Sequence, residues 1–271
     1  TEESLIVIPN AANVGAVRRV LEEAAEKHGG AVELRDVTSA RALVAAQGRQ
    51  ALTRLFRIAP ELPRVGHFEV ASTSFGALAG TGYTGEPGVE LHIDADEALQ
   101  WWGRLIDGGF TPAGLGARDT LRLEMGYPLH GSDLGAGITP LQAGLSWTVG
   151  WDKESFVGRE ALVDERQRGV TRRLRGVLLD GRQVPRHGCR VLADGAAVGE
   201  VTSGNLSPSL ERGVALALLT PAISEGTRVD VDIRGRLAPG RVVRLPFVRT
   251  ATAESESTTG IAEAGAPDLP G

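Results

Sequence analysis

The clearest structural signal in this chain lies in Gly82-Tyr83-Thr84-Gly85-Glu86-Pro87-Gly88-Val89-Glu90 and, further along, in Gly114-Leu115-Gly116-Ala117-Arg118-Asp119-Thr120-Leu121-Arg122-Leu123-Glu124. The first segment is a glycine-punctuated turn that leads into a strand bearing the carboxylate of Glu90. The second predicts a helix on which Arg118 and Arg122 lie four residues apart and are neighbours on one face. A carboxylate and guanidinium groups can pair with a polar, planar, anionic small molecule, so these segments give the first indication of function.

The composition is that of a globular protein, with 42% hydrophobic and 23% charged residues in 271. This length suits one large domain or two to three smaller ones. The net charge is −5 and positive charge is not clustered, which excludes a nucleic-acid-binding surface. The sequence shows no membrane-length apolar run and no signal peptide, and its single cysteine, Cys189, excludes a disulfide framework. We therefore expect a cytoplasmic location.

The first two thirds of the chain mix helical and strand-like patterns. Residues 5–8 predict a buried strand, and Asp94 with Glu97 resembles a capping box at a helix start. Thr139-Pro140 predicts the start of a short helix through Leu145. The remaining expected elements are helices at residues 13–28, 52–55, 94–107, 117–125 and 159–168 and strands at residues 41–46, 67–72 and 91–93.

From Leu174 onward, short β-type runs alternate with turns. Asp194-Gly195 lies between two apolar runs and predicts a tight hairpin. Alternation in residues 229–233 predicts a strand with one buried face. This region is expected to form a small all-β barrel or sandwich. Residues 251–271 contain almost no large apolar residue and are expected to be a disordered acidic tail.

Two familiar site patterns are excluded by their context. Residues 80–85 match Gly-x-Gly-x-x-Gly, but the dinucleotide fingerprint requires a helix to start inside it. Here Glu86-Pro87-Gly88 predicts a turn into a strand instead. The five histidines lack metal-ligand spacing, so no metal site is predicted.

The candidate site residues each have a structural and a functional interpretation. Glu90 shares a strand face with His92. A carboxylate there is either an ordinary residue of a solvated face or an acceptor for a ring with adjacent N–H donors, such as a pterin. Arg118 and Arg122 form either a salt-bridged helix face or an anion site; Arg118 lies in the first turn, where a cation opposes the helix dipole and favours an anionic partner. Tyr127 and Trp147 suit either the core or stacking on a flat ring, and Trp147 taken alone is expected in the core.

Several further motifs occur in an order typical of one family. They are Asn10-Ala11-Ala12-Asn13, the two segments above, Thr139-Pro140, residues 143–147, Asp152-Lys153, residues 156–162, residues 199–204, Ser207-Pro208 and Pro246-Phe247-Val248. With them the chain closely resembles the glycine cleavage system T-protein family of folate-dependent aminomethyltransferases, over essentially Leu5 to Val248.

The resemblance implies an α+β fold, a three-domain cloverleaf of the T-protein type with a C-terminal all-β barrel and the first part of the N-terminal region missing. It places residues 30–117 in an α/β folate-binding domain. Residues 1–29 and 118–169 would form a second α/β domain, and residues 170–250 the barrel.

The resemblance also implies the reaction. Tetrahydrofolate would take the methylene group from the aminomethyl-lipoyl arm of the partner H-protein, with release of ammonia. Glu90, Arg118, Tyr83 and Tyr127 match folate-binding positions of the family, and Asn10, Trp147 and His130 are possible pocket residues. No metal is implied.

The chain departs from the family pattern in three places. The family's catalytic aspartate is expected upstream of Thr1, so no catalytic residue is assigned; we expect the chain to be an N-terminally truncated fragment, inactive alone. Asp36 follows the first predicted helix and is not expected to act as the catalytic aspartate. His130 stands where the family usually has Tyr, and Gln142 where Glu is common.

Two alternatives stay open. The folate domain of sarcosine- or dimethylglycine-oxidising flavoenzymes shares most of these motifs and usually follows a flavin domain. Folate-binding iron–sulfur maturation factors are related but non-catalytic. They contain a cysteine motif that is replaced here by Glu154-Ser155-Phe156-Val157-Gly158-Arg159-Glu160, which argues against that interpretation.

Overall fold

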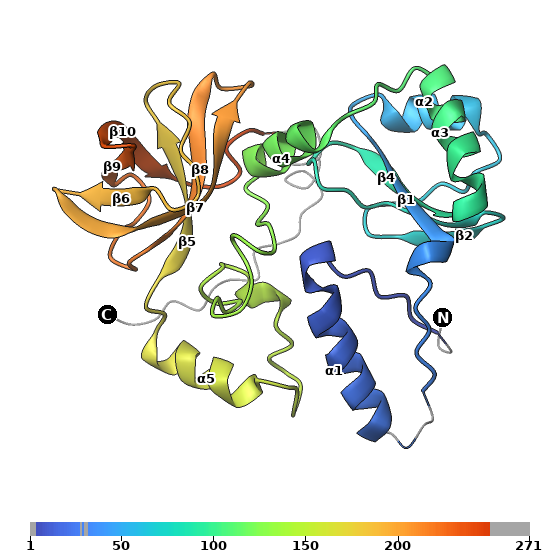
Figure 1. Cartoon of the computed structure of the whole chain (residues 1–271), viewed down its shortest axis with the longest axis horizontal. Helices are drawn as coiled ribbons and strands as arrows, with labels where there is room; N and C mark the ends of the chain where they lie inside the picture. Colours follow the sequence, from blue (N-terminus) through green and yellow to red (C-terminus); the bar gives the residue numbers. More distant parts are fainter. Residues whose placement is uncertain (1–3, 28, 30–31, 250–271) are drawn as a thin grey trace. The chain divides into compact units, whose positions relative to one another are not determined.

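The computed structural model describes residues 4–27, 29 and 32–249, so the tail predicted to be disordered lies outside the described residues. The chain divides into two compact units, each described by itself below. One comprises Thr1–Asp36 with Gly126–Phe247, and the other Val37–Met125 with Val248–Gly271. Figure 1 shows the elements of both units with the labels used in the text.

The unit Val37–Met125 is built on a four-stranded antiparallel sheet in the order β1-β4-β3-β2. Its strands are β1 (Arg41–Gln47), β2 (Val70–Thr73), β3 (Gly76–Ala79) and β4 (Gly88–Asp94). Helices α2 (Ala51–Ile58) and α3 (Ala98–Asp107) cover one face of the sheet, and α4 (Leu115–Glu124) follows (Figure 1). Leu55, Phe56, Trp101 and Leu105 of the helices pack with the apolar side chains of β4 in one core.

The two faces of strand β4 differ in burial. Val89, Leu91 and Ile93 are completely buried, whereas Glu90 and His92 point to the opposite face and are half-buried. This alternation confirms the predicted placement of Glu90 and His92.

One local prediction for this unit is only partly confirmed, and another is wrong. The strand expected at residues 67–72 starts only at Val70, because Phe68 has a φ of 61° and leaves the extended conformation. Asp94 makes no side-chain cap to the helix that follows it, which begins as a 3₁₀ turn, Ala95–Glu97. Its carboxylate instead pairs with Arg41 Nη1 at 2.5 Å across the β1–β4 ladder.

The described residues of the unit that includes residues 126–247 form two α-helices outside the barrel. They are α1 (Val14–Lys27), preceded by the 3₁₀ turn Ala11–Asn13, and α5 (Arg159–Arg168), which ends at Gly169 with a φ of 81°. Both match the sequence prediction. Asp36 pairs with Arg18 of α1, which agrees with leaving Asp36 out of the site.

Two predictions for this unit are also wrong. Residues 5–8 form no strand and are exposed, from 54% for Val7 to 89% for Leu5. A strand needs a neighbour for its N–H and C=O groups, and no described strand pairs with this segment. Residues 139–145 form turns rather than a helix, although Thr139 Oγ1 does accept from Gln142 N at 3.2 Å.

The C-terminal part of the same unit is a closed six-stranded barrel in the order β10-β5-β8-β7-β6-β9, as the sequence predicts (Figure 1). Its strands are β5 (Arg173–Leu179), β6 (Arg190–Ala193), β7 (Ala196–Ser207), β8 (Arg212–Leu219), β9 (Arg228–Ile233) and β10 (Arg236–Val243). The predicted hairpin at Asp194-Gly195 joins β6 to β7, with both residues at positive φ. Val229 and Val231 of β9 point into the core as predicted.

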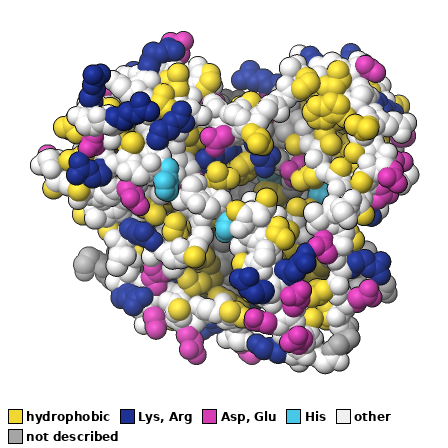
Figure 2. All heavy atoms as spheres, viewed as in Figure 1, with side chains coloured by type: hydrophobic (Ala, Val, Ile, Leu, Met, Phe, Trp, Pro, Cys, Tyr) yellow, Lys and Arg dark blue, Asp and Glu magenta, His cyan; other side chains and the backbone are white. Residues whose placement is uncertain are grey.

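The surface has a mixed charge pattern. Figure 2 shows Lys, Arg, Asp and Glu side chains interspersed over the face in view, including over α1 and α5. No described helix has the length and apolar character needed to cross a membrane.

Candidate functional site

The glycines of the turn before β4 make room for the protein's own groups. A Cβ at Gly80 would lie 1.9 Å from Gly66 O, and one at Gly82 would lie 2.1 Å from Gln47 Oε1. At Gly88 it would lie 2.4 Å from Ala46 O. Since the turn leads into β4 and no helix starts in it, the structure confirms that the dinucleotide-like pattern is a turn.

Glu90 occupies a sheet position flanked by small side chains. In the ladder it pairs with Ala45 of β1 and Ala79 of β3, so neither neighbouring strand places a long side chain directly beside it. Glu90 Oε2 accepts a hydrogen bond of 2.5 Å from Thr81 Oγ1. The carboxylate is therefore held at one oxygen.

His92 lies two residues further along the same face. Burial lowers the pKa of its imidazole below the ordinary value; the carboxylate of Glu90 opposes this shift and the guanidinium of Arg41 adds to it. The neutral form of His92 is thus favoured beside Glu90, so the two groups do not form a charged pair at neutral pH.

The turn also brings together two predicted site residues. The guanidinium carbon of Arg118 lies over the ring of Tyr83, 4.9 Å from its centroid. Arg118 is exposed and Tyr83 half-buried, so this stack presents a cation on a rigid aromatic support. Arg122 is different: it is only 2% exposed and its Nη2 pairs with Asp119 Oδ1 at 2.7 Å, which supports the salt-bridge interpretation for Arg122.

Sequence reasoning missed Thr81 and Gln47. Thr81 donates to Glu90, and Gln47 Nε2 donates to Thr81 O and Val89 O at 3.1 and 3.0 Å. Gln47 lies 34 residues before Thr81, so no local pattern indicates this contact. The glycines of the turn were the one sequence signal of this contact, since glycine is required where another group approaches the backbone closely.

The other predicted pocket residues belong to the unit that includes residues 126–247. Tyr127 and His130 are half-buried, and His130 Nδ1 is buried without a hydrogen-bond partner in the part of the chain that the structure describes. Asn10 is exposed and its carbonyl accepts from Asn13 N at 2.8 Å. Trp147 is 79% exposed, so its expected place in the core is wrong. An exposed aromatic ring is free to stack on a flat ligand.

The loop bearing Tyr127 and His130 is anchored by a buried carboxylate. Asp133 is completely buried, and its oxygens accept from Thr202 Oγ1 at 2.5 Å, Ser203 Oγ at 2.7 Å and Leu129 N at 2.8 Å. Thr202 and Ser203 lie at a register shift in β7. The network fixes this loop on the barrel.

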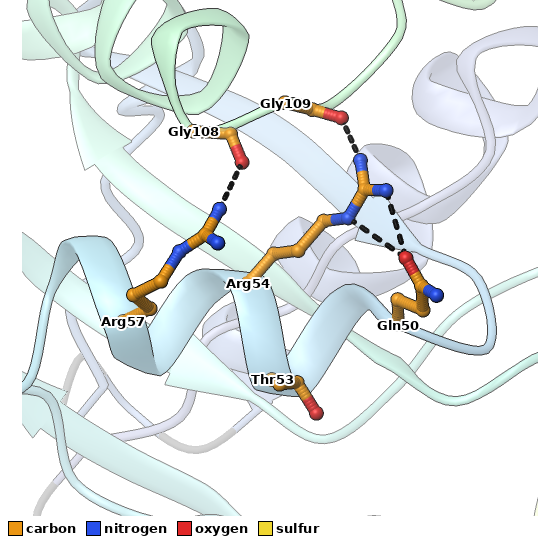
Figure 3. Close-up of a pocket in the computed structure, with 6 residues that line it drawn as sticks. All are labelled: Gln50, Thr53, Arg54, Arg57, Gly108 and Gly109. Atoms are coloured by element: carbon orange, nitrogen blue, oxygen red, sulfur yellow. Dashed lines mark hydrogen bonds between the residues drawn. The ribbon is translucent and has the colours of Figure 1, made fainter.

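A hollow lies between α2 and the end of α3 in the unit Val37–Met125. Its volume is about 520 Å³ and its lining is Gln50, Thr53, Arg54, Arg57, Gly108 and Gly109. Figure 3 shows Arg54 and Arg57 reaching from α2 to the carbonyls of Gly109 and Gly108, while Thr53 points away from them. Cations at the C-terminal end of α3 complement its dipole, so these arginines have a structural role.

The described residues contain no group of three or more His, Cys, Asp or Glu side chains that could hold a metal ion.

Comparisons with known proteins agree with the fold. Residues 1–153 match the GCVT N-terminal domain, and residues 172–249 match the glycine cleavage T-protein C-terminal barrel domain. The aminomethyltransferase of Synechococcus sp. (strain CC9311) is 42% identical over 262 residues, which cover 92% of this chain and 69% of the relative. That of Frankia alni is 45% identical over 256 residues, covering 91% of this chain and 69% of the relative.

A solved structure gives the same assignment. The glycine cleavage system aminomethyltransferase T from Bartonella henselae is 33% identical with a TM-score of 0.79, and the match covers 88% of this chain and 67% of that one. Two family models that together span most of the chain, relatives above 40% identity and a similar solved fold lead to one conclusion: the chain belongs to the glycine cleavage T-protein family of aminomethyltransferases.

Proposed function

We propose that this chain binds tetrahydrofolate through Glu90 and serves the transfer of the methylene group from aminomethyl-lipoyl H-protein to that folate, with release of ammonia. The observation that supports the proposal is the half-buried carboxylate of Glu90 between Ala45 and Ala79, on the sheet face opposite the helices. The named relatives are aminomethyltransferases, which favours this function over the flavoenzyme and iron–sulfur alternatives.

The residues present fit the pterin edge of a folate. One oxygen of Glu90 accepts from Thr81, and a carboxylate has about four acceptor positions, so Glu90 can still receive adjacent N–H groups. Alanine on both sides leaves room for a flat ring beside the carboxylate. Such charge-assisted hydrogen bonds contribute about 1.5–3 kcal/mol each.

Arg118 is proposed to take an anionic group of the folate. Its guanidinium is exposed and rests on Tyr83, an arrangement that keeps the planar fork in one orientation. Because Arg118 lies in the first turn of α4, an anion beside it also removes the repulsion between the arginine and the helix dipole.

In the proposed reaction tetrahydrofolate supplies the nitrogen atoms that receive the one-carbon unit. Glu90, Tyr83 and Arg118 bind and orient it, and holding two reactants in position can lower a barrier by about 7–11 kcal/mol. Tyr127, Asn10, Trp147 and His130 stay predictions from the family resemblance. The H-protein is the proposed partner because the family acts within the glycine cleavage system.

Calorimetric titration with tetrahydrofolate under anaerobic conditions tests the binding step. Glu90→Gln keeps the shape of the side chain but replaces one acceptor with a donor, so we expect affinity to fall about a hundredfold. Glu61→Gln is the matched control, since Glu61 is a carboxylate of the same unit that pairs with Arg104. Equal affinity in the wild type and Glu90→Gln, with both folded, would contradict the proposal.

A further inference from the structure

The amide of Gln47 is the centre of the glycine turn. Its Nε2 has two hydrogens, and they go to Thr81 O at 3.1 Å and Val89 O at 3.0 Å. Its Oε1 accepts from Thr84 Oγ1 at 3.3 Å. A flipped amide would place an oxygen against two carbonyl oxygens, so these contacts allow only one orientation of the amide.

This single amide ties together the two chain segments that meet at Glu90. Val89 directly precedes Glu90 in β4, and Thr81 lies at the start of the turn. Gly82 and Gly88 have no side chain where the Gln47 side chain lies, since Cβ atoms there would come within 2.1 and 2.8 Å of it. The glycines therefore let the turn close around Gln47.

Thr81 in turn holds the carboxylate. Its hydroxyl donates to Glu90 Oε2 at 2.5 Å, and no other hydrogen bond to the Glu90 side chain occurs among the described residues. Oε1 is thus left available, while the bond at Oε2 restricts the rotation of the side chain. A glutamate fixed before the ligand arrives loses less side-chain entropy on binding.

We propose that Thr81 is a positioning residue for folate binding: its hydroxyl sets the orientation of Glu90, and Gln47 holds Thr81 in place. This inference rests on the proposed function, since it requires Glu90 to contact the folate. A purely structural role for Thr81 is the competing explanation, and it predicts a loss of stability rather than a loss of affinity.

The test compares five variants by titration with tetrahydrofolate and by thermal unfolding. Thr81→Val keeps the shape and removes the hydroxyl, so we expect affinity to fall about three- to tenfold, the effect of freeing one glutamate side chain. Thr81→Ser keeps the hydroxyl and should restore affinity to within about twofold of the wild type. Thr53→Val is the matched control, because it makes the same change in the same unit at an exposed residue of α2 that is outside the Gln47–Thr81–Glu90 hydrogen bonds.

The remaining two variants, Glu90→Gln and the double variant Glu90→Gln with Thr81→Val, separate the explanations. If Thr81 acts through Glu90, the valine should cause no further loss in the Glu90→Gln background. Unchanged affinity in Thr81→Val, or an equal loss in both backgrounds, would overturn the inference while leaving the proposed function intact. Equal affinity in the wild type and Glu90→Gln would instead refute the proposed function, and the inference with it.

Discussion

Replacing Asp133 should destabilise the protein more than replacing any exposed aspartate. Asp133 is completely buried and accepts hydrogen bonds from Thr202, Ser203 and the backbone N–H of Leu129. In Asp133→Ala all three donors lose their acceptor. Thr202 Oγ1 can turn to Leu216 O, which lies 3.1 Å away, and Ser203 Oγ can use Ser132 Oγ at 3.2 Å.

In Asp133→Ala the backbone N–H of Leu129 has no other acceptor to turn to among its hydrogen bonds in the described part of the chain, and a cavity replaces the carboxylate. Loss of the acceptor of this part-buried N–H costs about 1 kcal/mol, and together with the cavity and the poorer contacts of the two buried hydroxyl groups we expect a loss of about 3–5 kcal/mol in the free energy of unfolding. For a protein of this size that lowers Tm by about 10 °C.

Asp133→Asn gives a sharper test of the same geometry. The amide oxygen can take the place of Oδ2 and accept from Leu129 N and Ser203 Oγ. The amide nitrogen then faces Thr202 Oγ1, whose own hydrogen can go to Leu216 O. Most contacts survive, so we expect a loss of only about 1–2 kcal/mol.

Scanning calorimetry of both variants checks these values. Asp180→Ala is the control, because Asp180 is an exposed carboxylate of the same unit paired with Arg228, and surface pairs contribute little. A Tm for Asp133→Ala within a degree or two of the wild type would refute the reasoning. Equal damage by asparagine and alanine would show that charge, rather than hydrogen-bond geometry, matters at this position.

The remaining predictions concern single positions of the unit Val37–Met125. Gly103→Ala should raise the free energy of unfolding by about 0.5–1 kcal/mol in calorimetry, because Gly103 lies inside α3 and an added methyl group meets no atom within 4 Å. Gly82→Ala should lower it by about 1–3 kcal/mol, since its Cβ would collide with Gln47; an unchanged Tm would argue against the clash. The pKa of His92 is lowered in the folded state. At a pH just below 6.5, the ordinary pKa of histidine, the unfolded chain therefore binds a proton more readily than the folded protein does. His92 therefore makes its full contribution to stability above pH 6.5, and this contribution is lost as the pH falls toward the lowered pKa. His92→Gln should flatten the dependence of Tm on pH between about pH 7 and pH 5. An unaltered profile would exclude His92 as a contributor.

Much of the local structure could be predicted because it depends on neighbours in sequence. Helix α5 ends at a glycine, the β6–β7 hairpin turns at Asp194-Gly195, and β4 alternates buried and half-buried residues. Each follows from periodicity and turn chemistry within about ten residues. The same local rules failed for residues 5–8, where an apolar run alone could not show whether a neighbouring strand exists.

The sequence by itself determined the family, the barrel and the face on which Glu90 lies, because motif order, turn signals and strand alternation are properties of the chain. Only the tertiary structure decided the partners of the polar groups. Gln47 meets Thr81 across 34 residues, and Asp133 meets Thr202 across 69. These contacts arise where strand pairing and barrel closure bring distant segments together. Hydrogen bonds typically span about 2.7–3.2 Å, and no spacing along the sequence can reveal which distant groups come that close.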